Sequence, residues 1–225
     1  MWQELREELH PRGLEIVTVA LDAAGVATAG PWIEKARARH PSLIDREHVS
    51  DALFGIVNVP SGVWIDERGT IVRPPELAHP ARPSYKDRAV PADATPEQRE
   101  RIEVVRALNV ESERYVGALR DWVSSGARSR YALGPDEVVR RSRPRPVGEA
   151  EAAAHFALGR ALHDGGERDD AIGHFREAHR LHPTNWTYRR DAWSLSAPEV
   201  YGTSWLHEVK REGVENYYPR LEMPE

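Results

Sequence analysis

Residues 58–72 restrict the possible folds of this chain more than any other stretch, because they have the pattern of a β-hairpin preceded by a proline. Residues 63–65 (Val-Trp-Ile) are strong strand formers, and residues 70–72 (Thr-Ile-Val) repeat the pattern after a short turn. Gly69 ends that turn, where a residue that tolerates positive φ is needed. Pro60 cannot donate a hydrogen bond to a sheet ladder, so we expect it just before the first strand. The stretch therefore predicts two adjacent antiparallel strands.

Upstream of the hairpin, the sequence predicts alternating helices and strands. Residues 1–10 carry apolar side chains at helical spacing, and residues 14–21 form a nearly continuous apolar run typical of a buried central strand. Residues 42–44 predict a short strand. We expect helices over residues 31–39 and 48–55.

The first of those two helices has a proline at its predicted start. Pro31 suits the first turn of a helix, and Trp32 and Ala36 are expected to face the core. In the second helix, Val49 and Leu53 are the predicted apolar positions.

This order of elements, ending in a Val-Pro-strand-Asp-x-x-Gly-strand hairpin, resembles the TlpA/ResA-like redoxins of the thioredoxin fold. The resemblance covers residues 1–73. It implies an α/β thioredoxin-like domain with a central mixed sheet flanked by helices, and a bacterial thiol–disulfide oxidoreductase. It also implies a cis bond before Pro60 and a substrate-binding loop made of Val59, Pro60 and Ser61.

The chain departs from that family at the residues that do the chemistry. It contains no cysteine, so it has no catalytic residue of its own and is expected to be inactive in disulfide exchange. The resemblance places the nucleophile, a cysteine or a selenocysteine, upstream of Met1. No cofactor is implied. The alternative is a non-catalytic thioredoxin-fold scaffold.

Residues 74–148 predict two irregular segments separated by helices. Residues 74–96 are rich in proline and predict a surface excursion; Thr95 and Gln98 then form a capping box at a helix start. Residues 110–124 predict the last helix of a first domain that spans residues 1–124.

Residues 125–148 predict a linker that contains a short helix at residues 135–141 and a basic run. Two interpretations of this run stay open: a solvated linker, or a docking site for an acidic partner or phosphate. Its members are Arg140, Arg141, Arg143 and Arg145.

Residues 149–183 resemble one tetratricopeptide repeat, which is a pair of antiparallel helices. The resemblance implies a small all-α module over residues 149–225 that binds a protein or peptide partner. It assigns packing roles to the following residues: Leu158, Gly159, Leu162, Ala171, Phe175, Ala178 and Pro183.

A single repeat cannot bury its own apolar face, so the chain after it must supply a cover. Residues 186–195 predict a third helix, and the tail that follows is aromatic. We expect the tail to cap the repeat and dock it on the first domain; the alternative is an exposed recognition surface. The aromatic residues of this tail are Tyr201, Trp205, Tyr217 and Tyr218.

Composition excludes several other classes. A net charge of −5 argues against a nucleic-acid-binding protein, and no run of 18 apolar residues predicts a membrane segment. The sequence as given favours a cytoplasmic location, with an upstream targeting segment left open.

Five histidines crowd the repeat without a zinc-binding motif, so no metal site is predicted. They are His155, His163, His174, His179 and His182.

Overall fold

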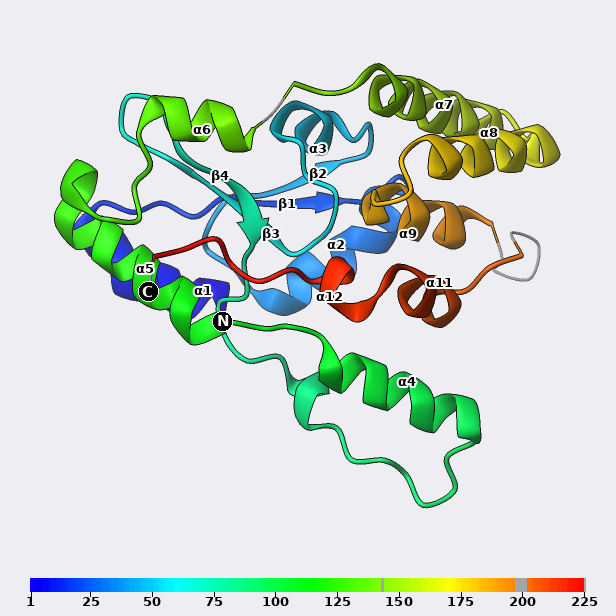
Figure 1. Ribbon diagram of the computed structural model, residues 1–225, viewed down its shortest axis with the longest axis horizontal. Helices are drawn as coiled ribbons and strands as arrows, with labels where there is room; N and C mark the ends of the chain where they lie inside the picture. Colours follow the sequence, from blue (N-terminus) through cyan, green and yellow to red (C-terminus); the bar gives the residue numbers. More distant parts are fainter. Residues whose placement is uncertain (143, 197–201, 225) are drawn as a thin grey trace.

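The computed structural model describes residues 1–142, 144–196 and 202–224, so Arg143 and Tyr201 lie outside the described residues. It shows a mixed α/β chain with small sheets and many helices (Figure 1). The elements up to the hairpin are α1 (Trp2–Leu9), η1 (His10–Arg12), β1 (Thr18–Leu21), α2 (Val26–Ala36), β2 (Ser42–Asp45), α3 (Val49–Phe54), β3 (Ser61–Ile65) and β4 (Ile71–Leu77).

The second half of the chain is helical. Its elements are η2 (Ser84–Asp87), α4 (Pro96–Ala107), α5 (Ser112–Ser125), η3 (Gly126–Arg128), α6 (Pro135–Arg141), α7 (Val147–Asp164), α8 (Arg168–Leu181), α9 (Trp186–Leu195), α11 (Trp205–Glu212) and α12 (Val214–Tyr217).

The strands form two separate sheets within the described residues, where the sequence predicted one central mixed sheet. β1 pairs with β2 in parallel, with Val19 opposite Leu43. β3 pairs with β4 antiparallel, with Trp64 opposite Arg73. Among the described residues, each strand therefore has a single hydrogen-bonded neighbour, and none is central.

The predicted burial of the first strand is wrong for the same reason. Val19 is 40% exposed and its neighbour Leu43 is 55% exposed, so this face of the two-stranded sheet is only partly covered. The two following helices also differ from prediction. α2 begins five residues before Pro31, and Trp32 on it is 70% exposed. On α3, Leu53 is 77% exposed.

The hairpin follows the predicted turn but has a longer second strand. Asp66 organises the turn, since its side chain accepts hydrogen bonds from the backbone N–H groups of Arg68 and Thr70 at 3.0 and 2.9 Å. Gly69 has the expected positive φ of 78°. β4 continues through Pro74 and Pro75 to Leu77, so the first residues of the predicted excursion belong to the sheet. Proline is tolerated there because the edge of a strand does not require the N–H group that proline lacks.

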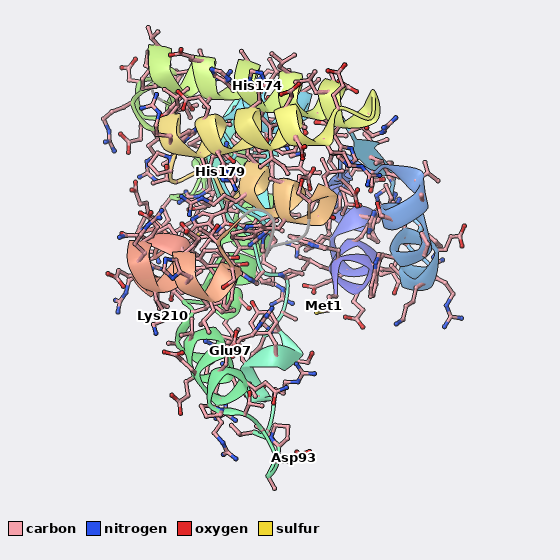
Figure 2. The ribbon with its side chains drawn as sticks, turned by 90° about the vertical axis from the view of Figure 1, so that its right-hand side faces the viewer. Met1, Asp93, Glu97, His174, His179 and Lys210 are labelled. Carbon is pink, nitrogen blue, oxygen red and sulfur yellow. The ribbon has the colours of Figure 1, made fainter. Side chains whose placement is uncertain are left out.

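The excursion and α4 together form an arm that projects from the body of the molecule (Figures 1 and 2). Figure 2 places Asp93 and Glu97 at the far end of the view from His174 and His179. The predicted capping box of Thr95 and Gln98 is present at the start of α4. α4 fully buries none of its residues; Val104 packs partly buried against the main core, and Leu108, just beyond the end of α4, is buried in it.

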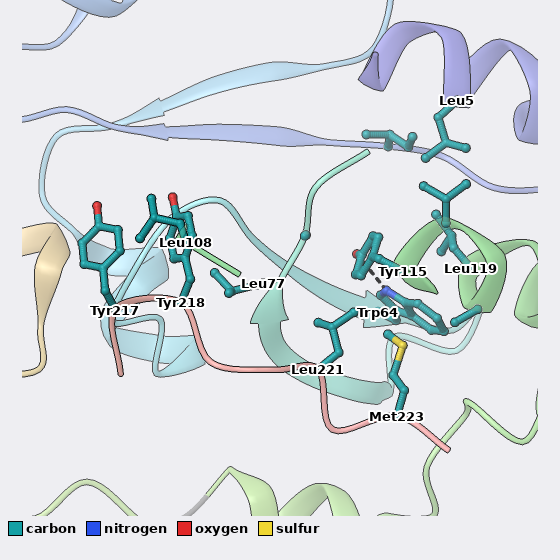
Figure 3. Close-up of a cluster of buried hydrophobic side chains, with 14 of the residues drawn as sticks. Leu5, Trp64, Leu77, Leu108, Tyr115, Leu119, Tyr217, Tyr218, Leu221 and Met223 are labelled. Carbon is teal, nitrogen blue, oxygen red and sulfur yellow. Dashed lines mark hydrogen bonds between the residues drawn. The ribbon is translucent and has the colours of Figure 1, made fainter. Parts of the chain in front are cut away.

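The main core surrounds Trp64. Its indole N–H donates to the Tyr115 hydroxyl at 3.0 Å (Figure 3). Its ring stacks on Trp122 at 5.1 Å between centroids. Gly62 is needed beside this pair, because a Cβ atom there would lie 2.4 Å from the Tyr115 hydroxyl. Leu221 and Met223 from the C-terminal tail complete the core (Figure 3). The tail thus packs into the core of the first part of the chain, where we expected it to dock.

The predicted repeat forms a compact helical hairpin of α7 and α8, with α9 packed against α8. We call α7, α8 and α9 the helical module. Phe175 is fully buried, and a Cβ atom at Gly159 would lie only 2.9 Å from its ring. Close packing of the two helices therefore requires glycine at this position.

The predicted packing residues of the repeat mostly lie inside the hairpin. Ala171 and Ala178 are fully buried, and Leu162 packs partly buried against the same cluster. Pro183 is exposed just after the end of α8. The prediction is wrong for Leu158, which is 46% exposed because it lies roughly 200° around α7 from the buried Phe156.

Candidate functional site

The predicted loop of Val59, Pro60 and Ser61 lies at the entry to β3, and the Val59–Pro60 peptide bond is cis as predicted. The loop is held by its own polar groups. The Ser61 hydroxyl donates to the Asn58 carbonyl at 2.6 Å, and the Asn58 side-chain oxygen accepts from the Val59 N–H at 2.9 Å. The Pro60 carbonyl accepts from the Ala78 N–H at 3.0 Å. The backbone of the loop is therefore largely satisfied from within the chain.

Segments far along the chain complete this loop. The Tyr218 hydroxyl donates to the Val59 carbonyl at 2.8 Å, and the Arg190 guanidinium reaches the same oxygen at 3.3 Å. The Asn58 amide donates to the Tyr217 carbonyl at 2.6 Å. Burial raises the pKa of the Tyr218 phenol above its usual range, so this hydroxyl remains a donor at neutral pH. The loop is thus the point where α9 and the tail attach.

A buried charged network lies beside this attachment point. The His48 Nδ1 is 2.7 Å from the Asp51 carboxylate, and its Nε2 is 2.8 Å from the Asp191 carboxylate. Asp191 also accepts from the Ala23 N–H at 2.9 Å, and Thr187 donates to Asp51 at 2.8 Å. We call residues 1–125, from α1 to α5, the α/β half. Since Asp51 is on α3 and Asp191 is on α9, His48 joins the α/β half to the helical module.

The charge state of His48 follows from its surroundings. Burial alone would lower the pKa of its imidazole, but hydrogen bonds to Asp191 and Asp51 outweigh burial and raise that pKa to about 9. The ring also packs edge-on against Phe156 and Tyr188, at 4.9 and 5.7 Å between centroids. A protonated imidazole between two carboxylates is therefore the resting state of this junction at neutral pH.

A cavity of about 890 Å³ opens between the same two halves of the chain. We call it the junction cavity. Its walls come from α3 and the segment after it, β4, the end of α6 with the linker, the start of α9, and the C-terminal tail. Arg73, on one wall, is fully buried and binds the Glu76 carboxylate and the carbonyls of Tyr131 and Glu222. The cavity is thus lined both by charged side chains and by apolar ones such as Leu53, Ile56 and Val57.

Among the histidines of the helical module, His155 and His174 form a close pair. The Nδ1 atoms of His155 and His174 are 2.8 Å apart, across the interface of α7 and α8. No group of three or more histidine, aspartate or glutamate side chains is placed to bind a metal ion within the described residues. The pair by itself supplies two ligands, fewer than a structural zinc site needs.

His48, Asp51 and Asp191 were not predicted as a group from the sequence. Asp51 and Asp191 are 140 positions apart, and neither lies in a motif. The one available signal was a histidine just before a helix, and that signal is common. Among the predicted site residues, those of the loop and those of the helical module do not come together in one pocket. His48 and the junction cavity lie between them.

Comparisons with protein-family models, curated proteins and solved structures found no match. None of the helices in residues 1–142, 144–196 and 202–224 combines the length and the hydrophobicity needed to cross a membrane.

Proposed function

We propose that this chain is a non-catalytic binding protein, in which a thioredoxin-like α/β half serves as the scaffold and the helical module helps to recruit a peptide or protein partner. The order α1, β1, α2, β2, α3, β3, β4 supports the thioredoxin-like assignment of the first half, and the helical hairpin of α7 and α8 supports the tetratricopeptide-like assignment of the second.

The observation that carries the proposal is the occupied carbonyl of Val59. In a redoxin the corresponding loop receives substrate, whereas here the Tyr218 hydroxyl and the Arg190 guanidinium occupy this oxygen. The chain also has no thiol to form a mixed disulfide. Both facts favour a loop that anchors the tail over a loop that positions a substrate.

The catalytic side of the proposal has a direct test. The pure chain should show no turnover of insulin disulfides above the rate of dithiothreitol alone, because thiolate attack is the first step of exchange. Turnover by this cysteine-free polypeptide would contradict the proposal. Sequencing the transcript upstream of the Met1 codon is the complementary test, since an in-frame cysteine or UGA codon there would favour the redoxin alternative.

The binding side is tested by panning a random peptide library against the immobilised chain. Selected peptides are then synthesised and their affinities measured by fluorescence anisotropy. The proposal expects peptides that bind with dissociation constants of about 100 μM or tighter, which corresponds to roughly −5.5 kcal/mol. Failure to recover any peptide of that affinity would contradict it.

A further inference from the structure

We propose that the junction cavity binds a short acidic peptide segment. This inference rests on the proposed binding function and names the surface and the chemical class of the ligand. It also chooses between the two interpretations of the basic run around residues 140–145.

The size of the cavity suits such a ligand. Its volume of about 890 Å³ is near the upper end of the range of about 300–1,000 Å³ typical of ligand pockets. A single small ion would leave most of this space to water. A few residues of extended peptide would fill it and contact both halves of the chain.

The balance of charge on the walls favours an anionic ligand. Each carboxylate that lines the cavity has a basic side chain beside it: Asp51 has His48, Glu76 has Arg73, Glu149 has His182 at 3.8 Å, and Glu222 has Arg141 at 3.5 Å.

Two arginines on the walls have no such carboxylate partner among the described residues. Arg220 makes no hydrogen bond or ion pair with them, and Arg145 bonds there to a neutral group, the Ala52 carbonyl. In addition, Arg140 pairs with the Glu137 carboxylate, which it shares with Arg141, and Arg141 also reaches Glu222 at 3.5 Å. Carboxylates of a ligand would give these guanidinium groups the bidentate partners that they bind best.

The remaining features of the cavity favour a peptide over an inorganic anion. One oxygen of the buried Asp51 carboxylate, Oδ1, accepts no hydrogen bond from the described residues, which is costly unless a donor reaches it. Because Oδ1 is itself buried, a peptide N–H would reach it once the Asp51 side chain turns toward the cavity, whereas phosphate would bring a second anion to this wall. Leu53, 77% exposed, adds an apolar contact on the wall.

Strand β4 in the wall of the cavity indicates how a peptide would be recognised. Pro74 and Pro75 on β4 have no N–H groups, so an added strand could not form a complete hydrogen-bonded ladder along it. Recognition would then depend on the side chains of the peptide rather than on strand addition.

The experiment uses the whole chain and two labelled eight-residue peptides in an anisotropy titration. One peptide alternates glutamate and leucine; in the other, glutamine replaces every glutamate. Arg220→Glu is the test variant, because this side chain is exposed and unpaired among the described residues. Arg128→Glu is the matched control: Arg128 is also exposed, makes no hydrogen bond or ion pair within the described part of the chain, and does not line the cavity. Circular dichroism checks that both variants are folded.

The proposal expects binding of the acidic peptide and weak binding of the neutral one. Arg220→Glu should weaken binding of the acidic peptide by about tenfold or more, a loss of about 1.4 kcal/mol, because it replaces a guanidinium partner of the peptide carboxylates with another carboxylate. Arg128→Glu should leave the affinity within about twofold. Higher salt should weaken binding of the acidic peptide.

Several results would overturn the proposal: equal affinity for the two peptides, equal effects of the two variants, or complete displacement of the peptide by millimolar inorganic phosphate. Failure of the inference can be told apart from failure of the proposed function. If library panning yields peptides that bind tightly but are not acidic, and Arg220→Glu does not affect them, the inference fails and the proposed function stands. If panning yields no peptide, both fail.

Discussion

The helical module and the α/β half differ in how far apart in sequence their core contacts lie. In the helical module, Phe156 packs against Phe175 and Tyr188, so its core residues lie within about one repeat of each other. In the α/β half, Trp64 packs with Tyr115, and Met223 completes the same core. The core of the helical module can form from one local stretch of chain, whereas the core around Trp64 requires distant segments of the chain to meet.

This difference shows where a local pattern is a sufficient guide. The repeat-like pattern of residues 149–183 places small and large residues at fixed offsets, so about 35 residues are enough to predict which side chains of the α7–α8 hairpin pack together. The α/β half recruits its last core residues from a tail with no recognisable motif. The following predictions test whether the two regions behave as differently as their contacts suggest.

The largest effect is expected from breaking the local core. Phe175→Ala should reduce the free energy of unfolding by about 3–5 kcal/mol, because it leaves a cavity where a fully buried ring packs. Denaturant unfolding measures the loss, and hydrogen exchange should show weakened protection in residues 150–195. Leu158→Ala on the same hairpin is the control and should cost within about 0.5 kcal/mol. A loss below about 1 kcal/mol for Phe175→Ala would contradict the assignment of this core.

Removing the connection between the two regions should have the next largest effect. His48→Leu leaves the carboxylates of Asp51 and Asp191 buried without their cation, which should cost about 3 kcal/mol. Hydrogen exchange should then show lower protection on both α3 and α9. His207→Leu, at an exposed position on α11, is the control. Unchanged exchange on α9 would mean that the two regions are held together elsewhere.

The same histidine predicts how stability depends on pH. Its folded-state pKa of about 9 exceeds the value of about 6.5 expected in the unfolded chain. Its contribution is therefore complete below about pH 6.5 and is lost as pH rises through about 9, by roughly 3 kcal/mol in total. Urea unfolding between about pH 6.5 and pH 9 measures most of this loss, below the pKa of about 10 at which tyrosines of the unfolded chain ionise. In His48→Leu the slope should be flatter; an equal slope would assign the effect to another group.

The smallest effect is expected at the attachment of the tail. Tyr218→Phe removes the hydroxyl that donates to the Val59 carbonyl and should cost about 1 kcal/mol, the usual net value of one hydrogen bond. Arg190 remains near the same oxygen and limits the loss. Faster hydrogen exchange at residues 58–61 would locate the effect in the loop, and Tyr131→Phe is the control. If the variant is as stable as the parent chain, the anchoring role of Tyr218 is wrong.

Several elements were predictable because their signals are local. Thr95, Pro96 and Gln98 mark the start of α4, and the structure shows the capping box they predict. Pro135 begins α6, because a proline fits the first turn of a helix. Pro183 follows the end of α8, because a proline cannot continue a helix. The hairpin turn was predictable from two of its own residues. The Asp66 side chain accepts hydrogen bonds within the turn, and Gly69 adopts the positive φ that the turn needs.

Burial was the property that local patterns predicted least well. Trp32, Val19 and Leu53 lie at positions whose spacing indicates a core, yet Trp32 and Leu53 are largely exposed and Val19 is 40% exposed. Hydrophobic periodicity identifies a face of a helix or strand, and it does not identify what covers that face. Conversely, Asp51 and His48 are buried although both are polar, because each is the partner of the other.

Local residues and composition were enough to specify the helical hairpin of α7 and α8, the capped start of α4, the β3–β4 turn and the absence of a thiol in this chain. Each of these depends on residues within one turn, within one repeat, or on the residue types present. Three other features were visible only in the folded chain: the tail fills the Trp64 core, Tyr218 occupies the Val59 carbonyl, and His48 joins Asp51 to Asp191. These features bring together residues from opposite ends of the chain, and the free energy that selects them comes from burial and pairing in the assembled molecule, which no local pattern records.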